Sequence, residues 1–359
     1  MKWTKWFQHK AISRRDLIKV SALGTLFGGM NAWANLQTPA ASATRHEALG
    51  MVGQVDHVRN GFDPTILLQD FDYGSVSQLD DGTTLREYEI VAIDKEIEVA
   101  PGVFFPAWTY NGRVPGHTIR CVEGDLIRIR FVNGGSHPHT LHFHGIHSAA
   151  MDGIPGIGAG SIEPGKNTTY EFRAAPFGCH LYHCHAFPLK RHIHKGLYGA
   201  FIVDPDPKRY QGEERAMAKT RHHASPENAQ FNEMVMVMNG FDTNLDGDNE
   251  VYAVNSIGFA YQKQPIRIRR KQRQRLYLIN ATEFDPVNSF HLHANFFDYY
   301  DHGTTLAPTL KTVDTLMQCQ AQRGILEFSF EGFEPGKYMF HAHQSEFAEL
   351  GWMGFFEVI

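Results

Sequence analysis

Histidines in four His-x-His pairs are the residues of this chain whose types and spacing point most directly to chemistry. The pairs are His142/His144, His183/His185, His291/His293 and His341/His343. On a β-strand, residues i and i+2 project from the same face, so each pair aims two imidazoles at one place. Imidazole binds copper, zinc, iron and nickel, whereas eight clustered imidazoles without a metal would repel or go unpaired. The pairs therefore predict a metal centre.

A thiol stands inside one pair, in His183-Cys184-His185. This segment continues to His192-Ile-His-Lys-Gly-Leu197, and His139-Thr-Leu-His142-Phe-His144-Gly precedes it in the chain. A blue, type 1 copper needs two histidines, one thiolate and a weak axial group. Of the four cysteines, Cys184 alone has such neighbours.

Together these segments resemble the copper motifs of the multicopper oxidases, the family of laccases and ceruloplasmin. The resemblance implies that His139, Cys184 and His192 bind the type 1 copper. His194 is an alternative to His192, and the family spacing His-x-x-x-Gly favours His192. Leu197 falls on the axial position, where many relatives carry Met, and a leucine cannot coordinate.

The resemblance also implies a type 2/type 3 trinuclear cluster, and hence four coppers per chain. By the family pattern, the type 2 copper binds His142 and His291. The type 3 pair binds the other six paired histidines, which are His144, His183, His185, His293, His341 and His343. The implied function is a laccase-like oxidase, which couples one-electron oxidation of a donor at the type 1 copper to four-electron reduction of O2 to water.

Asp152 follows the first histidine motif in Met151-Asp152-Gly153. A carboxylate there could relay protons to bound oxygen, which makes Asp152 a candidate catalytic residue beside Cys184. An aspartate before glycine is equally typical of a turn.

The elements that position these residues are expected to be strands. Alternation of apolar and polar residues is plain in Leu126–Val132, Ile266–Arg269 and Ile325–Phe330, and many short strands with Gly/Pro turns predict an all-β sandwich. The turn Glu-Pro-Gly-Lys occurs at 163–166 and again at 334–337. We therefore expect two cupredoxin-like Greek-key β-sandwich domains, at 80–206 and 230–359. An N-terminal extension at 35–79 and a linker at 207–229 complete this division.

The two halves differ where the type 1 ligands would stand. Asn288 replaces His139 and Ala342 replaces Cys184, so no blue copper can form in the second half. This resembles two-domain members of the family that keep the blue copper in the N-terminal domain. The resemblance implies a homotrimer in which the first domain of one chain faces the second domain of its neighbour, with clusters shared at the interfaces.

Residues 1–34 are predicted to be a twin-arginine signal, which implies a periplasmic or otherwise exported protein. Ser13-Arg14-Arg15 is followed by an apolar run from Val20 to Met30, which is shorter than the ~20 residues of a spanning helix. A membrane anchor is the alternative, and no membrane span is expected in the mature chain. The net charge of −5 predicts no nucleic-acid partner.

The other cysteines are expected to be structural. Cys121 and Cys319 are predicted to be buried strand residues, and a Cys121–Cys179 disulfide is an alternative.

Two functions of other classes compete with the oxidase. A copper nitrite reductase is also a trimer of two-domain chains, but its single type 2 copper would have no need of His142 or His185. A non-catalytic copper carrier or electron-transfer protein would need only the blue site. Partners of the oxidase would be O2 and a small electron donor: a phenol, an aromatic amine, a metal ion or a redox protein.

Overall fold

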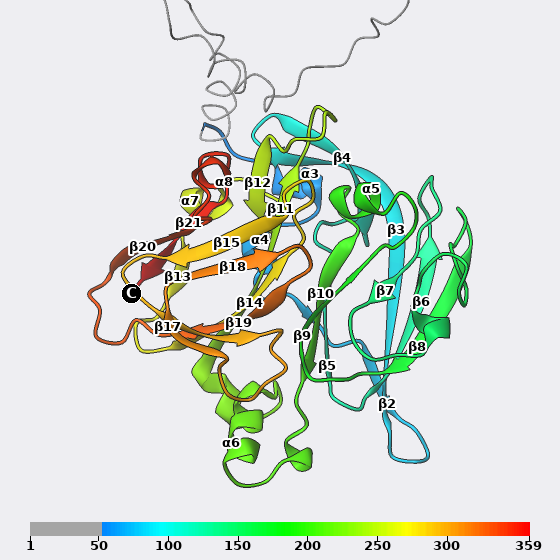
Figure 1. Cartoon of the computed structure of the whole chain (residues 1–359), viewed down its shortest axis with the longest axis horizontal. Coiled ribbons are helices and arrows are strands. Elements are labelled where there is room, and N and C mark those ends of the chain that lie inside the picture. The colour runs from blue at the N-terminus through cyan, green and yellow to red at the C-terminus, as the bar shows by residue number, and fades with distance from the viewer. Residues whose placement is uncertain (1–51) are drawn as a thin grey trace, which may run out of the picture. The chain divides into compact units, whose positions relative to one another are not determined.

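Alternating apolar residues build four β-sheets in the computed structural model, which describes residues 52–359 (Figure 1). Strand β6 (Leu126–Asn133) illustrates the cause. Ile127, Ile129 and Phe131 are buried, whereas the side chains between them are half-buried or exposed. The alternation seen in the sequence thus places one face of this strand in a core.

Two of the sheets form the first sandwich, from residues 71–204. Sheet I has the order β2-β3-β6-β8, with β4 paired to β3. Its strands are β2 (Ser75–Gln78), β3 (Thr84–Ala100), β4 (Val103–Tyr110), β6 and β8 (Asn167–Arg173). Sheet II has the order β1-β5-β10-β9-β7. Its strands are β1 (Phe71–Asp72), β5 (Thr118–Val122), β10 (Tyr198–Asp204), β9 (Gly178–His183) and β7 (His142–Phe143).

The other two sheets form the second sandwich, from residues 231–358. Sheet III has the order β12-β11-β14-β19-β16-β17. Its strands are β12 (Val251–Val254), β11 (Phe231–Phe241), β14 (Arg273–Asn280), β19 (Arg323–Phe328), β16 (Phe297–Asp301) and β17 (Leu310–Val313). Sheet IV has the order β13-β21-β20-β15-β18. Its strands are β13 (Ile266–Ile268), β21 (Met353–Val358), β20 (Gly336–His341), β15 (Val287–Leu292) and β18 (Thr315–Cys319). The fold is all-β, with two cupredoxin-like sandwiches, as predicted.

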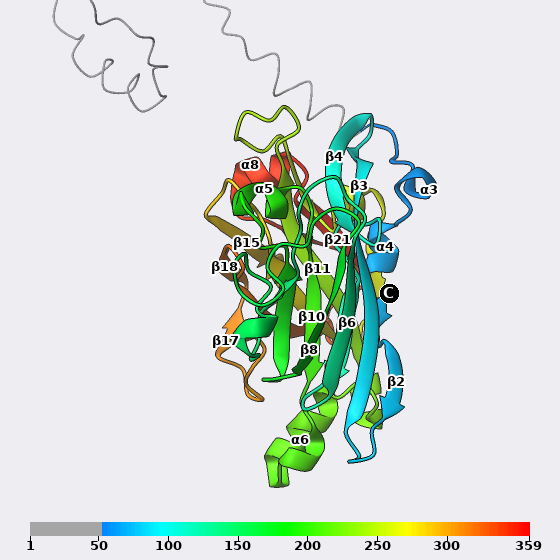
Figure 2. The same ribbon diagram turned by 90° about the vertical axis from the view of Figure 1, so that its right-hand side faces the viewer.

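The helices in the described residues are short; α3 and α4 precede the first strand, and the others lie in connections between strands. They are α3 (His57–Asn60), α4 (Pro64–Leu67), α5 (Leu189–His194), α6 (Gly212–Arg221), α7 (Ala260–Lys263) and α8 (Ser345–Glu349). Helix α6 lies in the segment between the sandwiches, and both views place it at the opposite end from α5 and α8 (Figures 1 and 2). No helix of the described residues is long and apolar enough to cross a membrane.

The four sheets stack as layers. Sheets II and III are the middle two, and both of their faces are buried. Every residue of β9 and β10 is buried, and β14 is buried after its first residue. One apolar cluster fills the space between sheets I and II, another lies between sheets II and III, and a third lies between sheets III and IV. The two sandwiches of one chain therefore share a core.

Buried ion pairs cross this shared core. Arg120 of β5 binds Asp204 at 3.0 Å and Glu233 of β11 at 2.7 Å. Arg275 of β14 binds the same Glu233 at 3.2 Å and Glu327 of β19 at 2.8 Å. Burial raises the pKa of Glu233, but the two arginines outweigh it and hold this pKa at about 2. The pairs fix how the middle sheets face each other, because unpairing a buried charge is costly.

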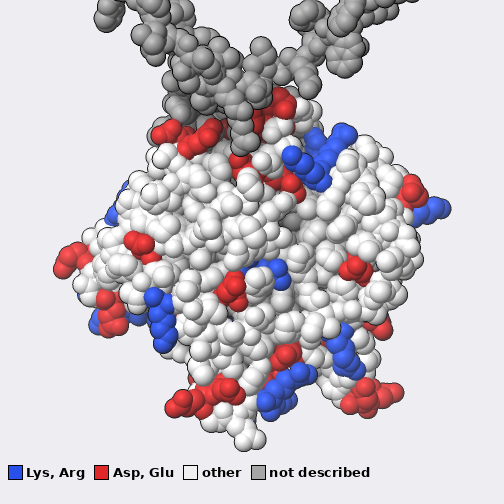
Figure 3. All heavy atoms as spheres, viewed as in Figure 1, with Lys and Arg blue, Asp and Glu red and all other residues white. Residues whose placement is uncertain are grey.

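One expectation about the cysteines was wrong, and the alternative of a Cys121–Cys179 disulfide is not met. Cys319, at the end of β18, is exposed and not buried. Cys121 and Cys179 are both free, because they belong to the cores on opposite faces of sheet II. The predicted signal at 1–34 lies outside the described residues. On the face drawn in Figure 3, acidic and basic side chains are interspersed, and neither sign gathers into a large patch.

Candidate metal centre

His139, Cys184 and His192 come together inside the first sandwich. Cys184 directly follows β9, His192 lies on α5, and His139 precedes β7. The Cys184 sulfur is 3.2 Å from His192 Nδ1 and 3.9 Å from His139 Nδ1, and the two Nδ1 atoms are 3.2 Å apart. All three residues are buried. Two imidazole nitrogens and one sulfur that converge away from water are the donor set of a type 1 copper.

Burial sets the protonation of this group. Desolvation lowers the pKa of both His139 and His192 to about 4, so the imidazoles are neutral at pH 7. Desolvation also raises the pKa of the Cys184 thiol, although the Thr140 backbone N–H, which donates to the sulfur at 3.3 Å, opposes this. Neutral imidazoles are ready to bind a metal, whereas the thiol must lose its proton first.

Leu197 and His194 are the two other residues that the sequence links to this group. Leu197 is fully buried in the same apolar cluster as Cys184, and its carbonyl accepts the Cys184 N–H at 3.0 Å. His194 does not join the group. Its Nε2 accepts the Asp242 backbone N–H at 2.9 Å, in the direction of the second sandwich. The structure thus brings His192, and not His194, to the sulfur.

The paired histidines of the first sandwich form one group, which we call the first half-set: His142, His144, His183 and His185. His142 of β7 is the direct cross-strand partner of His183 of β9. His144 Nε2 lies 3.1 Å from His183 Nε2. The Nδ1 of His183 lies 2.9 Å from the Cys184 carbonyl and donates to it, which leaves the Nε2 lone pair of this histidine facing the group, as a metal ligand requires.

The second sandwich repeats this arrangement in what we call the second half-set: His291, His293, His341 and His343. His291 of β15 is the cross-strand partner of His341 of β20. His293 Nε2 lies 2.9 Å from His341 Nε2, and His341 Nδ1 lies 2.6 Å from the Ala342 carbonyl. Each sandwich therefore builds the same four-histidine geometry on its own pair of strands.

In both half-sets, an aspartate backbone carbonyl also contacts one of the histidines. His142 Nδ1 lies 2.7 Å from the Asp152 carbonyl, and His291 Nδ1 lies 2.9 Å from the Asp314 carbonyl. Such contacts fix the tautomer and the orientation of a metal-binding imidazole. Asp314 escaped sequence analysis because it stands 23 residues from its histidine, whereas Asp152 stands 10 residues from His142. Because these two separations differ, the repeated contact cannot be recognised in the sequence.

The Asp152 side chain also turns to the first half-set. Its Oδ1 is 3.1 Å from His142 Nδ1 and 3.7 Å from His147 Nε2. Asp152 is half-buried and follows the short helix η1 (Ala149–Met151). In this position the carboxylate can orient His142.

In the second sandwich, side chains fill the position that corresponds to the His139, Cys184 and His192 group of the first. Ala342 takes the place of Cys184, and its N–H donates to the Trp352 carbonyl at 3.2 Å, as the Cys184 N–H does to Leu197. Trp352 is fully buried, and its indole N–H donates to the Asn288 side chain at 3.0 Å. An indole and a hydrogen bond occupy the interior that a copper and its ligands would need.

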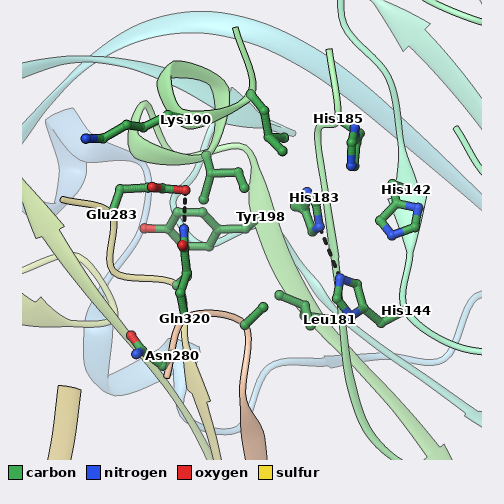
Figure 4. A pocket seen from close by; sticks show the side chains of 14 residues that line it. His142, His144, Leu181, His183, His185, Lys190, Tyr198, Asn280, Glu283 and Gln320 are labelled. Carbon is green, nitrogen blue, oxygen red and sulfur yellow. Dashed lines mark hydrogen bonds between the residues drawn. The ribbon is translucent and has the colours of Figure 1, made fainter. Parts of the chain in front are cut away.

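The two half-sets do not meet within the described residues of one chain. Metal-binding groups and ring contacts there join histidines of the same half-set and never mix the two. A cavity of about 590 Å³ opens beside the first half-set, and its opposite wall carries Asn280, Glu283 and Gln320 of the second sandwich instead of histidines (Figure 4). His293 and His343 are exposed. Within the described residues, each half-set therefore stands apart from the other.

Arg323 of β19 reaches the first half-set from the second sandwich. One guanidinium N–H lies 3.4 Å from His144 Nδ1, and another lies 3.3 Å from His180 Nδ1. Burial, with the charges of nearby groups, lowers the pKa of His144 to about 2. Sequence analysis missed this contact, because only the packing of the sandwiches brings the two residues together.

Comparisons with known proteins identify relatives of both sandwiches. Two family models described as multicopper oxidase match residues 94–208 and 223–359. A crystal structure of a multicopper oxidase is 55% identical, with a TM-score of 0.77 over 85% of this chain and 100% of that one. The blue copper oxidase from Nitrosomonas europaea is 26% identical, with a TM-score of 0.62 over 76% of this chain and 86% of that one.

A curated relative of another activity also matches. The copper-containing nitrite reductase of Neisseria meningitidis serogroup A is 36% identical over 115 residues, which are 32% of this chain and 29% of the relative. The match therefore spans less than a third of that relative's length.

Proposed function

The chain belongs to the multicopper oxidases, with two cupredoxin-like sandwiches, and from this premise we propose that it oxidises a donor and reduces O2 to water. The residues present fit copper. His139, Cys184 and His192, with Leu197 as a non-coordinating axial neighbour, would hold a type 1 copper, and the half-sets would hold a type 2/type 3 cluster. Bound copper would accept single electrons at the first site and deliver four of them to O2 at the second.

The duplication of the four-histidine geometry carries this proposal. Two half-sets supply eight imidazoles, which is the ligand number of a trinuclear cluster in this family. Cys184 lies between His183 and His185, so covalent bonds alone connect its sulfur to both imidazoles. Each O2 would take four electrons, from four donor molecules, and four protons to give two molecules of water.

Completion of the cluster requires a second copy of the chain. Each half-set is unpaired in its own chain and lies at an open surface or cavity. A ring in which the first half-set of one chain meets the second half-set of the next satisfies every chain, and a closed ring is the usual outcome of such a head-to-tail contact. We assign three chains to this ring, because the two-domain members of the family that this chain resembles are trimers.

Nitrite reduction is the second candidate, favoured by the similarity to the Neisseria nitrite reductase. A single type 2 copper would leave His142 and His185 without a role, although both belong to the first half-set. The donor of the oxidase would be a phenol, an aromatic amine, a metal ion or a redox protein. Twin-arginine export to the periplasm remains a proposal that rests on Arg14 and Arg15.

The test is a copper count followed by two assays on the copper-loaded full chain. We expect four coppers per chain and rapid O2 uptake with an outer-sphere donor such as ferrocyanide. The same preparation, supplied with nitrite in the absence of O2, should form little nitric oxide. Two coppers per chain with fast nitric oxide formation would assign the protein to the nitrite reductases instead.

A further inference from the structure

The cavity beside the first half-set contains polar groups that the proposed function has not used. Its walls are His142, His144, His183 and His185 on one side and Glu283, Gln320 and Asn280 of the second sandwich on the other. Leu181, Leu189 and Ile193 line the space between these walls. In Figure 4 Glu283 lies on the side of the cavity opposite the labelled histidines, and its carboxyl points into the cavity.

Glu283 is a buried carboxyl without a salt-bridge partner among the described residues. The Gln320 amide donates to its side chain, and its own backbone carbonyl accepts from Asn249 at 2.8 Å. Lys190 of α5 is the nearby cation, but its ammonium lies over the Phe284 ring, 3.8 Å from the centroid. Asp285, the next acid along the chain, is bound by Asn249 and Tyr252 at 2.9 and 2.6 Å.

Burial without a bound cation raises the pKa of Glu283 to about 7, against the smaller opposing effects of Gln320 and Lys190. A carboxyl with such a pKa exchanges its proton readily at neutral pH, which is the property of a proton donor and acceptor in catalysis.

The same cavity has room for water. The cavity volume of about 590 Å³ accommodates many water molecules. Water between Glu283 and the first half-set would connect the two walls by hydrogen bonds.

We propose that Glu283 is a proton-relay residue, which delivers protons through cavity water to the first half-set while O2 is reduced there. This inference rests on the proposed function, in which each O2 consumes four electrons from the donor and four protons from solvent. Glu283 gives its proton to cavity water and regains one from solvent water, so the carboxyl is unchanged after each transfer. Asp152 is not a member of the cavity wall and is occupied by His142.

The first test uses Glu283→Gln in the copper-loaded full chain, with Glu331→Gln as the matched control at an exposed position. Wild-type turnover with ferrocyanide and O2 should fall as the pH rises through about 7. We expect Glu283→Gln to lose roughly tenfold or more in turnover below pH 7 and to lose this pH dependence. Glu283→Asp should regain part of the rate, Glu331→Gln should keep the wild-type profile, and reduction of the blue site by ferrocyanide should be unchanged in all variants.

The second test needs no turnover. Infrared difference spectra of the copper-free wild type, recorded between about pH 6 and pH 8, should show a carboxylic acid band that titrates near pH 7 and is absent in Glu283→Gln. Absence of this band in the wild type, or a Glu283→Gln profile identical to wild type, would overturn the relay and leave the oxidase intact. Failure of the wild type to consume O2 would overturn both, even if the band titrates.

Discussion

Two inactive variants of this chain should restore each other's activity when they are assembled together. His183→Ala breaks the first half-set, and His293→Ala breaks the second, so each variant alone should reduce O2 at a negligible rate. In a mixed ring, a cluster is intact where a chain with a sound first half-set meets a chain with a sound second half-set. The half-sets of one chain do not meet, so this combination arises only between chains.

The size of the recovery follows from this arrangement. In an equal mixture, about half of the first half-sets and half of the second half-sets are intact, and a cluster needs one of each. About a quarter of the clusters should therefore work, and O2 uptake should reach about a quarter of the wild-type rate. The assay is O2 uptake with ferrocyanide after the two variants are unfolded, mixed, refolded and loaded with copper.

A double variant provides the matched control. Chains with both His183→Ala and His293→Ala, mixed equally with wild type, should also give about a quarter of the wild-type rate if clusters are shared between chains. Clusters built within one chain would give about a half. No recovery from the two single variants, in rings that mass spectrometry proves to be mixed, would refute the shared cluster.

Three further predictions concern single side chains. Cys184→Ser should abolish the blue absorption band but leave the histidine-bound copper in place, which metal analysis and the visible spectrum would measure; persistence of the band would show that Cys184 is not the thiolate ligand. Leu197→Met should lower the reduction potential of the blue site, because a thioether stabilises Cu(II) over Cu(I); a redox titration that finds an unchanged or higher potential would remove residue 197 from the axial position. Burial raises the pKa of Glu283 from its ordinary value of 4.5 to about 7 in the folded chain, so the folded state binds the extra proton between these values and the free energy of unfolding falls as the pH rises through this window. Glu283→Gln should therefore gain stability over wild type above about pH 7, by on the order of 1–2 kcal/mol after allowance for hydration of the cavity, and equal differences in urea midpoint at pH 5 and pH 8 would contradict this.

The grouping of the candidate ligands was predictable because these residues stand in short segments of the sequence. His-x-His needs only a strand to bring two imidazoles to one face, and Cys184 between two histidines marks the blue site without any tertiary information. The choice of His192 over His194 came from the family spacing, and the structure supplies its physical reason: helix α5 turns His194 toward Asp242.

Residues that act through the packing of the sandwiches were not predictable. Glu283 and Arg323 belong to the second sandwich, yet they line the cavity or contact the imidazoles of the first. A strand with alternating residues usually keeps one side in solvent, but Ile325 and Glu327 of β19 are both buried because sheet III lies between two other sheets. Glu327 remains polar in this interior because Arg275 binds it.

Because side chains fill the interior at Trp352, the two sandwiches differ in whether their cores require a metal ion. The second sandwich closes its core with residues that every new chain already carries: Ala342, the indole of Trp352 and the amide of Asn288. The first sandwich instead encloses a thiol and two imidazoles whose pKa values burial has shifted toward their uncharged forms. We expect the interior of the second sandwich to close without copper, although its half-set of histidines awaits the ion, and the interior of the first sandwich to reach its full rigidity only after the ion arrives. Without copper, the chain would then have a closed core in its second sandwich and a less rigid core in its first. The half that is synthesised first would become rigid last.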